Sequence, residues 1–549
     1  MTDLVHLLKR YSAAKTNRDT LLSTWREAAD YIRPSRHNLG DSLGENNNPN
    51  RNVTSEIFDT TAIDAARTYA AGCMSWMTPS ETNWFSYDPP ESLKEDDNIK
   101  SWYSKCTDIT RQVLAASNFY SEIHECYLDD GTFGTTGLLI EEGGKSGLRF
   151  EVLQIGKYCI LEDDEGNVDT VFRELALTIR QAAKKFGAEN LAEAHRRALE
   201  ENSKNCDIVH SFIHCVMPRE DAERDLGKLD GENMPYASIY IDEKHRHIVK
   251  ESGTHEFSIP VHRHTKCFNS VWGWAPAMQA MTDIRQLNYM QSLLDTEVER
   301  HVSPPVRAPS NFEGKIDLRA GGVTFFKDGA AKPEFWESRG NTRIGEDRTF
   351  FRTQQINRAF HVELFQALSS VPVGKEMTAA EIHMRQKDRL TLFSPTFARK
   401  NNELNTPIAR RVFAILLRGG AYPDPPEGLI TQTPEGLPFI PDPEITYTSR
   451  LALQMKAIHN DAYMRSMQES AFLFEMYPQT ADNFDPDNIA RSIYRNNGAP
   501  EDGLRPEQDR DSLREERAEA EAQTEEELSA IDEAGAVSQL ASSGAIPTA

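Results

Sequence analysis

The sequence of 549 residues lacks the features that mark secreted proteins, membrane-spanning proteins and proteins that grip nucleic acid. Its seven cysteines stand singly, with no Cys-x-x-Cys pair, which is typical of a reduced intracellular protein rather than a disulfide framework. No run of 18 apolar residues occurs, and the start MTDLVHLLKRYSAAK is too polar for a signal peptide, so we expect no membrane contact. The formal net charge of −24 argues against binding of nucleic acid over a broad basic face.

Motifs that would indicate an enzyme are missing as well. Gly-Gly-Lys-Ser at residues 143–146 resembles the end of a phosphate-binding loop, but Leu139 stands where that motif requires a glycine. The acidic stretch 162–169 lacks the ligand order of a calcium-binding loop, so we interpret it as a β-turn. The sequence shows no nucleophile elbow and no carboxylate cluster typical of a nuclease or polymerase. We therefore predict that the protein is not an enzyme, has no catalytic residue and needs no cofactor.

A group of potential metal ligands lies within one short stretch: His255, His262, His264 and Cys267. On a strand, His262 and His264 would point to the same side, which is compatible with a metal site. A surface strand that carries two histidines explains the same spacing without a metal. We favour that interpretation and predict no metal-binding residue.

What the sequence does contain is helical periodicity around one strand-rich region. Apolar residues recur at three- and four-residue steps, which predicts helices at 3–33, 55–77, 94–117 and 120–130. Apolar and polar residues then alternate, which predicts strands over 135–175, 206–218 and 235–250, with short helices at 177–186 and 189–202. These patterns indicate an α+β domain over the first 275 residues.

Helices dominate the second half of the chain, so the expected fold class is α+β, mainly helical. They are predicted at 276–301, about 347–368, 378–418, 448–475 and 485–496, with a strand-rich insertion after the first. Thr378-Ala-Ala-Glu381 forms a capping box at the start of the third helix, and Pro395 and Pro407 predict kinks within it. From residue 501, fourteen acidic and four basic residues give a charged helix pattern, whose low-complexity end we expect to be disordered.

Four segments, in the same order along the chain, resemble the portal (head-to-tail connector) proteins of short-tailed bacteriophages. The most extensive, EMTAAEIHMRQKDRLTLFSPTFARKNNEL at 376–404, has that family's Met-Thr-Ala-x-Glu start, its Arg-Gln pair and its Pro–Phe step. The others are FDTTAIDAARTYAAGCMSWMTPSETNWFSYD at 58–88, GWAPAMQAMTDIRQLN at 273–288 and PPVRAPSNFEGKIDLRAGGVTFF at 304–326. The resemblance covers residues 5–475, although Arg-Ala-Gly-Gly at 319–322 replaces the Arg-Pro-Gly-Gly that the family often has.

The resemblance implies a ring of twelve subunits around a central channel for double-stranded DNA. It implies seven parts within the subunit: a wing (1–275), a first stem helix (276–301), a clip (302–345), a second stem helix (346–368), a tunnel loop (369–377), a long kinked helix that returns to the wing (378–497), and an acidic crown or barrel helix with a disordered tail (498–549). An acidic subunit suits such a channel, because a strongly basic channel wall would bind DNA too tightly for it to slide.

The implied function is that of a portal at one capsid vertex, through which DNA is packaged and ejected. The implied partners are further copies of the chain, double-stranded DNA, the major capsid protein, a scaffolding protein, the large terminase subunit and then a tail adaptor. The implied location is the virion, after assembly in the host cytoplasm. Two alternatives stay open: a terminase-type packaging ATPase would need the phosphate-binding loop that fails at Leu139, and a scaffolding protein would need sustained heptads, which only the tail approaches.

Two sets of residues are candidates for these contacts. The predicted tunnel loop contributes Val371, Pro372, Val373, Gly374 and Lys375. Its single lysine could touch DNA or could be a solvated loop residue. The predicted clip, with seven basic and five acidic residues, contributes Arg307, Lys315, Arg319, Phe325, Phe326, Phe335 and Trp336. Its aromatic residues could bind a neighbouring subunit or a partner, or could fill a small core of the clip itself.

Overall fold

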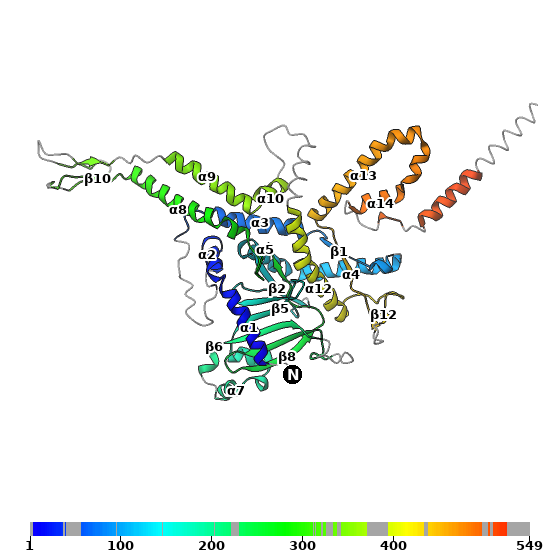
Figure 1. The fold of residues 1–549 in the computed structure, drawn as a ribbon, viewed down its shortest axis with the longest axis horizontal. Coiled ribbons are helices and arrows are strands. Elements are labelled where there is room, and N and C mark those ends of the chain that lie inside the picture. The colour runs from blue at the N-terminus through cyan, green and yellow to red at the C-terminus, as the bar shows by residue number, and fades with distance from the viewer. Residues whose placement is uncertain are drawn as a thin grey trace, which may run out of the picture. The chain divides into compact units, whose positions relative to one another are not determined.

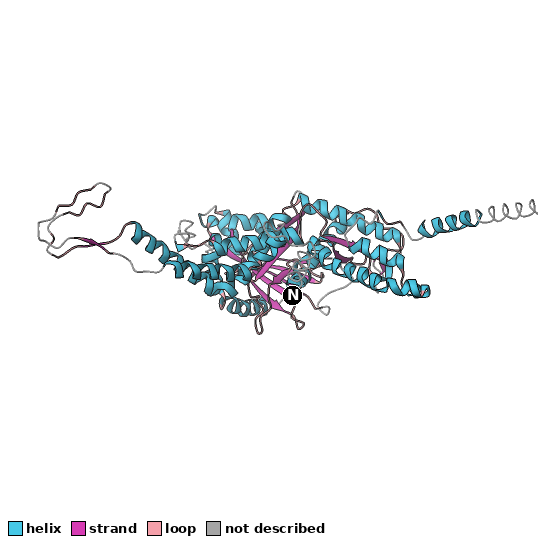
Figure 2. Ribbon diagram, turned by 90° about the horizontal axis from the view of Figure 1, so that it is seen from above, coloured by secondary structure: helices cyan, strands magenta, loops and turns pink. Residues whose placement is uncertain are grey.

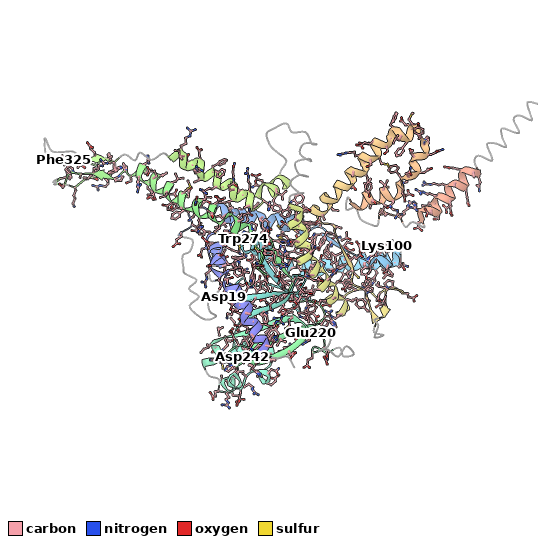
Figure 3. The ribbon with its side chains drawn as sticks, in the orientation of Figure 1. Asp19, Lys100, Glu220, Asp242, Trp274 and Phe325 are labelled. Atoms are coloured by element: carbon pink, nitrogen blue, oxygen red, sulfur yellow. The ribbon has the colours of Figure 1, made fainter. Side chains whose placement is uncertain are left out.

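The computed structural model shows a chain of mixed helices and strands (Figures 1 and 2), with side chains drawn in Figure 3. It describes residues 4–36, 39, 56–94, 96–144, 147–201, 204–220, 230–310, 312, 315–319, 322–325, 333–336, 342–369, 393–432, 438–496, 503–505 and 509–523. The chain divides into two compact units, the first formed by residues 1–91 and 102–449 and the second by residues 92–101 and 450–549. In the described part, no helix combines the length and apolar character needed to cross a bilayer.

The amino-terminal pattern forms two helices, α1 (Leu4–Asp19) and α2 (Leu22–Ile32), where the sequence predicted one over 3–33. Between them the backbone hydrogen bonds shorten to a three-residue spacing, which turns the chain. The break allows the apolar sides of the two helices to pack on different elements. Whereas α1 lies on a sheet, α2 places Trp25 against Trp272, with ring centroids 4.9 Å apart.

Three further helices follow: α3 (Thr61–Met77), α4 (Asp97–Ala116) and α5 (Phe119–Phe133). The helix predicted from residue 55 begins at Thr61 instead, because the Asp59 carboxylate accepts from the Thr61 amide at 2.8 Å and holds the preceding turn. α5 ends at Gly134, whose φ of +75° is left-handed. A Cβ there would lie 2.6 Å from the backbone nitrogen of Ala275, so only glycine fits between α5 and the next strand.

Two antiparallel sheets lie in the first unit, one in the order β3–β2–β9 and one in the order β4–β5–β6–β7–β8. Their strands are β2 (Thr135–Glu142), β3 (Leu148–Val152), β4 (Tyr158–Glu162), β5 (Val168–Thr178), β6 (Val209–Pro218), β7 (Tyr236–Asp242), β8 (His247–Thr254) and β9 (Val261–Arg263). The predicted strands over 135–175 and 206–218 are confirmed. The strands predicted over 235–250 form a hairpin of β7 and β8, which extends to Thr254.

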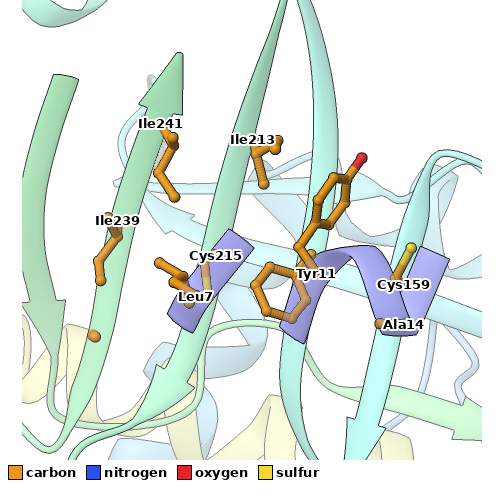
Figure 4. Packing of buried hydrophobic residues seen from close by; sticks show 10 residues of the cluster. Leu7, Tyr11, Ala14, Cys159, Ile213, Cys215, Ile239 and Ile241 are labelled. Carbon is orange, nitrogen blue, oxygen red and sulfur yellow. The ribbon is translucent and has the colours of Figure 1, made fainter. Parts of the chain in front are cut away.

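Helices cover both faces of the five-stranded sheet. On one face, α1 packs Leu7, Tyr11 and Ala14 against a set of apolar strand residues that includes Ile213 (Figure 4). On the other face lie α6 (Ile179–Phe186) and α7 (Glu193–Glu200), and Phe186 packs on Phe212. Phe212 and Ile213 are neighbours in β6 and therefore point to opposite faces of the sheet. Successive side chains of this strand thus pack alternately on the α6 side and on the α1 side.

Two long helices lie antiparallel and side by side (Figure 1): α8 (Pro276–Val302) and α9 (Thr342–Ala359). α8 coincides with the helix predicted over 276–301. Asp283 forms an ion pair with Arg352 at 2.6 Å, and Leu294 packs closely on Gly345 further along the pair. The 27 residues of α8 span roughly 40 Å at 1.5 Å per residue.

The helix predicted over 347–368 is broken in two. α9 ends at Ala359, and α10 (Val362–Ser369) begins after His361, whose φ of +55° lies in the left-handed region. This conformation is uncommon for histidine and is kept only where the surroundings favour it. Here the turn brings the Phe365 ring over Gly72 of α3, where a Cβ would lie 2.3 Å from the ring.

The segment from residue 393 to 418 is a helix with one wide turn. It is α-helical over 393–400, adopts π-helical geometry at Asn401–Asn405 and continues as α12 (Thr406–Arg418). Pro407 explains the wide turn, because proline has no amide hydrogen to donate and its ring collides with the carbonyl four residues earlier. The capping box predicted at Thr378 lies outside the described residues, as does everything from 370 to 392.

Short strand pairs and further helices complete the described chain. The pairs are β1 (Phe85–Asp88) with β14 (Glu444–Tyr447), β10 (Val306–Arg307) with β11 (Glu334–Phe335), and β12 (Thr431–Gln432) with β13 (Pro438–Phe439). The second unit contains α13 (Arg450–Met476), α14 (Pro486–Asn496) and a helical stretch at 509–523. Asp487 of α14 pairs with Arg514 of that stretch at 2.5 Å. The low-complexity end of the chain, 524–549, lies outside the described residues.

A buried group of charged residues joins four elements of the first unit. The carboxylate of Asp130 in α5 forms an ion pair with the ammonium of Lys400, and solvent reaches neither side chain. The Tyr69 hydroxyl of α3 donates to Asp130 at 2.6 Å and accepts from Lys400 at 2.7 Å. The rings of His262, in β9, and His264, just after it, approach the same carboxylate at 3.2 and 3.3 Å.

These contacts keep the Asp130 carboxyl charged. Burial alone would raise its pKa, but the positive charge of Lys400 and the adjacent His264 and His262 hold the pKa well below its usual range. A fully buried charge is tolerated only where it is paired. The group therefore fixes α3, α5, β9 and the segment around Lys400 relative to one another.

Glu403 extends the buried group by one more carboxylate. Its two oxygens accept hydrogen bonds from the Arg263 backbone amide and from the Arg263 guanidinium, each at 2.8 Å. Burial alone would raise the pKa of Glu403, but the neighbouring His262 and Arg263 outweigh that effect and lower its pKa to about 2.

The interpretation of His262 and His264 as residues of a surface strand is therefore wrong. His262 is fully buried, and only 8% of the surface of His264 is exposed. The strand β9 pairs with β2 inside the first unit. The two-residue spacing correctly places both rings on one side. Their partner Asp130 lies far earlier in the sequence, so no local pattern reveals that this side is buried.

Substitution of Lys400 by methionine removes the charge that pairs with Asp130 and keeps an unbranched side chain that is only one atom shorter. We expect Lys400→Met to lower the free energy of unfolding by about 3 to 5 kcal/mol, because a buried carboxylate loses its cation. Urea unfolding followed by circular dichroism measures this change. Lys250→Met, at an exposed position of β8, is the control and should change the free energy by less than about 0.5 kcal/mol. Equal unfolding midpoints for the two variants would contradict the role of the pair.

The low pKa of Glu403 predicts a loss of stability in acid. A carboxyl whose pKa is lower in the folded than in the unfolded chain stabilises the fold above its unfolded pKa, and this contribution disappears as the pH falls through the folded pKa. We expect the contribution of Glu403, roughly 3 kcal/mol from the pKa difference, to be lost between pH 4.5 and about 2. Thermal unfolding of the wild type and of Glu403→Gln over this range tests it. The wild type should lose more stability than the variant, and parallel profiles would refute the prediction.

Candidate functional site

The predicted clip lies beyond the end of α8 and contains the strand pair β10–β11. Val306 stands opposite Phe335 in this pair. The Trp336 amide donates to the Pro305 carbonyl at 2.7 Å, and the Arg307 guanidinium lies over the Trp336 ring, 3.6 Å from its centroid. These contacts hold the tryptophan ring in one position.

The aromatic side chains of the clip are exposed. Phe325, Phe335 and Trp336 are 83%, 61% and 51% exposed, and Leu318 and Val323 are exposed beside them in sequence. Figure 3 labels Phe325 at the far end of this segment. Apolar groups gathered in one short exposed segment are typical of a surface that another molecule covers. This exposure favours a contact outside the chain over a core within the clip, and the assignment stays a prediction. Phe326 lies outside the described residues.

The basic candidates of the clip have different surroundings. Arg307 is stacked on Trp336, whereas Lys315 is exposed. Arg319 pairs with Asp317 at 2.8 Å, and the hydrogen bond from this guanidinium lowers the pKa of Asp317. The Arg319 side chain is nevertheless 87% exposed, so it stays accessible to an acidic partner.

The tunnel-loop candidates lie outside the described residues: Val371, Pro372, Val373, Gly374 and Lys375. Buried aromatic residues on either side of the undescribed stretch 370–392 are in contact. The Phe393 ring lies 5.7 Å from that of Phe365 and 5.5 Å from that of His361, centroid to centroid. Burial, helped by the nearby His264 and Lys400, lowers the pKa of His361 to about 4, so this ring is neutral at pH 7. An aromatic contact therefore joins the described residues before 370 to those after 392.

Lys400, the cation that pairs with Asp130, was not predicted from the sequence. Its position did carry a signal, because Phe393, Phe397 and Leu404 mark the apolar side of the helix and Lys400 falls on that side at the same spacing. A lysine on a buried helical face requires a buried anion. The sequence does not indicate which acidic residue supplies that anion.

Comparisons with known proteins point to one family. The family model described as "Bacteriophage head to tail connecting protein" matches residues 5–504. The "Probable portal protein" of Bordetella phage BPP-1 is 26% identical over 493 residues, which cover 88% of this chain and 85% of that protein. The "Portal protein" of Salmonella phage epsilon15 is 27% identical over 529 residues, which cover 94% of this chain and 91% of that protein.

Two solved structures match this chain with lower sequence identity. A chain from "Neck of empty GTA particle computed with C6 symmetry" is 11% identical with a TM-score of 0.40, over 84% of this chain and 96% of that one. A chain from "Virion of native gene transfer agent (GTA) particle" is 10% identical with a TM-score of 0.35, over 74% and 89%.

The match to the family model extends over nearly the whole chain, and the two phage relatives are matched over most of their own length. The predicted resemblance to portal proteins is thereby confirmed. The chain belongs to the family of bacteriophage head-to-tail connecting proteins, and it functions as a portal, a structural connector rather than an enzyme.

Proposed function

We propose that twelve copies of this chain form a closed ring at one capsid vertex, around a channel through which double-stranded DNA is packaged and later ejected. The observation that carries the proposal is the exposed aromatic surface of the clip, beyond the antiparallel pair α8 and α9. A single chain leaves this surface in water, and a neighbouring copy in a ring would cover it.

Each element of the subunit has a place in that ring under this proposal. The two sheets and their helices, over residues 1–275, form the wing. α8 and α9 are the stem helices on either side of the clip, and α10 leads into the tunnel loop at 369–377. The helical segment 393–418 returns to the wing, where Lys400 forms an ion pair with Asp130.

The crown begins earlier in this proposal than the resemblance implied. α13 and α14 belong to the same compact unit as the acidic tail and not to the unit that contains the sheets. We therefore place the start of the crown near Arg450 instead of residue 498. Its helices and the acidic tail lie inside the capsid in this arrangement.

The acidic composition suits a channel through which DNA slides. Each phosphate contact by lysine or arginine releases counterions and adds affinity, so a basic wall would hold DNA in place. A ring of subunits with a formal charge of −24 each repels the DNA backbone, which keeps the duplex centred and mobile.

The clip is the end that we assign to docking, first of the large terminase subunit and later of the tail adaptor. Its exposed cations Lys315 and Arg319 and its aromatic residues offer both charge and apolar surface to these partners. The wing faces the major capsid protein and, during assembly in the host cytoplasm, the scaffolding protein. The finished ring is part of the virion.

The ring and its clip contacts can be tested together by electron microscopy of the purified full chain. The wild type should give closed rings with a central hole that average to twelve-fold symmetry. Replacing both Phe325 and Trp336 by serine should reduce the fraction of closed rings several-fold, because neighbouring copies lose apolar contact surface. Phe268→Ser is the matched control, since Phe268 is 95% exposed but lies outside the clip. A wild type without rings would refute the proposed assembly, and unchanged rings in the double variant would refute the contact between copies.

Lys375 is proposed to give each subunit one weak contact with DNA phosphates. Lys375→Ala should leave ring formation intact and should lower the amount of DNA packaged and retained, because the ring loses one cation per subunit. A packaging assay with terminase, followed by nuclease protection of the retained DNA, measures both quantities. Lys375→Arg keeps the charge and should restore packaging. Normal packaging and retention in the alanine variant would show that Lys375 does not contact DNA.

A further inference from the structure

A second group of buried titratable residues lies at the end of the five-stranded sheet, away from the clip and the tunnel loop in sequence. It comprises His195 of α7, Asp242 at the end of β7 and His245 in the turn between β7 and β8. One Asp242 carboxylate oxygen lies 3.2 Å from Nδ1 of His195 and 2.8 Å from Nδ1 of His245. The potential ligand atoms of all three residues lie within 4.8 Å of one another.

The Asp242 carboxylate is oriented by the turn that follows it (Figure 3 labels this residue). Its other oxygen accepts hydrogen bonds from the backbone amides of Lys244 and His245, at 3.1 Å each. Arg246 closes the turn with a φ of +49°. The carboxylate is 1% exposed, so one oxygen is held by the backbone and the other faces the two imidazoles. Outer contacts of this kind fix the ligands of metal sites in proteins.

The His195 ring is buried without a satisfactory hydrogen bond. The residue is 3% exposed, and neither of its ring nitrogens has a hydrogen-bond partner of proper geometry in the described part of the chain. Nε2 of His210, on β6, is also buried without a partner, and its ring centroid lies 4.7 Å from that of His195. Buried polar atoms without partners are rare, because each one costs free energy on folding. Two imidazoles that converge in this state point to a missing ligand.

A histidine binds a metal ion through a ring nitrogen that carries a free lone pair, and the rings of His195 and His210 offer buried nitrogens without a hydrogen-bond partner. Lys244 is the adjacent cation, and its side chain is exposed to solvent that screens its charge.

We propose that His195, Asp242 and His245 bind a divalent transition-metal ion of the zinc type, with His210 as the nearest further nitrogen ligand. Imidazole nitrogen with a single carboxylate oxygen suits Zn²⁺ and its neighbours and does not suit Mg²⁺ or Ca²⁺, which prefer all-oxygen sites. Bonds of about 2.0 to 2.2 Å at tetrahedral angles separate ligand atoms by about 3.3 to 3.6 Å. The distance of 3.2 Å from the Asp242 oxygen to His195 lies close to that separation, whereas the distance of 2.8 Å to His245 is shorter and has to widen when the ion binds.

The role of the ion would be to hold α7 on the sheet. His195 is the only residue of α7 that is fully buried, while Ala198 and Leu199 pack on the apolar core beside it, so what the imidazole binds adds to the docking of this short helix. An ion shared by α7 and the β7–β8 turn would cross-link them, and with His210 it would reach β6 as well. This structural site is independent of the ring proposed above.

Zinc titration of the purified full chain, after dialysis against a chelator, tests the proposal. Isothermal titration should show one Zn²⁺ bound per chain with a rise in the thermal midpoint, whereas Mg²⁺ should produce neither effect. His245→Ala should weaken Zn²⁺ binding by more than about 10-fold, the loss that even an outer-contact substitution causes. This variant carries the test if His195→Ala does not fold, because the His245 side chain is 27% exposed and lies in a turn.

His247→Ala is the matched control, since His247 lies two residues further along at the start of β8, is exposed, and contacts the Asn190 carbonyl instead of Asp242. It should bind Zn²⁺ like the wild type. Asp242→Asn keeps an oxygen for the two backbone amides but removes the charged ligand, and it should weaken binding as His245→Ala does. A wild type that binds no Zn²⁺, or a His245→Ala variant that binds it as tightly as the His247→Ala control, would overturn the proposal.

Discussion

The buried ion pair between Asp130 and Lys400 is the interaction on which the arrangement of the first unit depends. Asp130 lies in the last turn of α5, directly before Gly134 and the start of β2, so its position sets where the smaller sheet begins. Lys400 lies directly before the π-helical turn that leads into α12. Apolar contacts are non-directional and tolerate sliding, whereas a charge with no access to water has one favourable position. The pair therefore fixes the segment that follows the predicted tunnel loop more sharply than the packing of Phe365 and Phe393 alone.

A connector in the proposed ring has to be strong within and between subunits and weak toward DNA. In the described residues, each of these demands is met by a different kind of contact. Strength within the subunit lies in paired charges that water cannot reach, and the surface suited to a neighbouring copy is aromatic. The proposed contact with DNA is a single lysine per subunit in a chain of strongly negative charge. A ring repeats each of these contacts once per copy. A contact with DNA that is weak in one subunit therefore adds up around the proposed ring, yet remains weak enough for the duplex to move.

The sequence predicted the elements whose pattern is local. The strand-rich stretch at 135–175, the strand β6 and the helix α8 were located within a few residues, because alternation and helical periodicity report directly which side chains face a core. The breaks at residues 20–21 and 360–361 were missed, since each depends on a partner elsewhere, such as Gly72 under Phe365. The exposure of Phe325 and Trp336 was one of two alternatives that the sequence left open. Residues 371–375 could be named from the resemblance, but their role stays a prediction.

The histidines show most clearly what a sequence pattern leaves open. Asp130 with His262 and His264, and Asp242 with His195 and His245, are two groups of one aspartate and two histidines, and each group contains one residue that is distant in sequence from the other two. They differ in one respect. Lys400 pairs with Asp130, whereas in the described part of the chain no lysine or arginine side chain forms an ion pair with Asp242. A buried carboxylate needs a cation. Where the protein supplies one, the neighbouring histidines complete an ion-pair network; where it does not, neutral histidines and a carboxylate are the ligands that a metal ion requires.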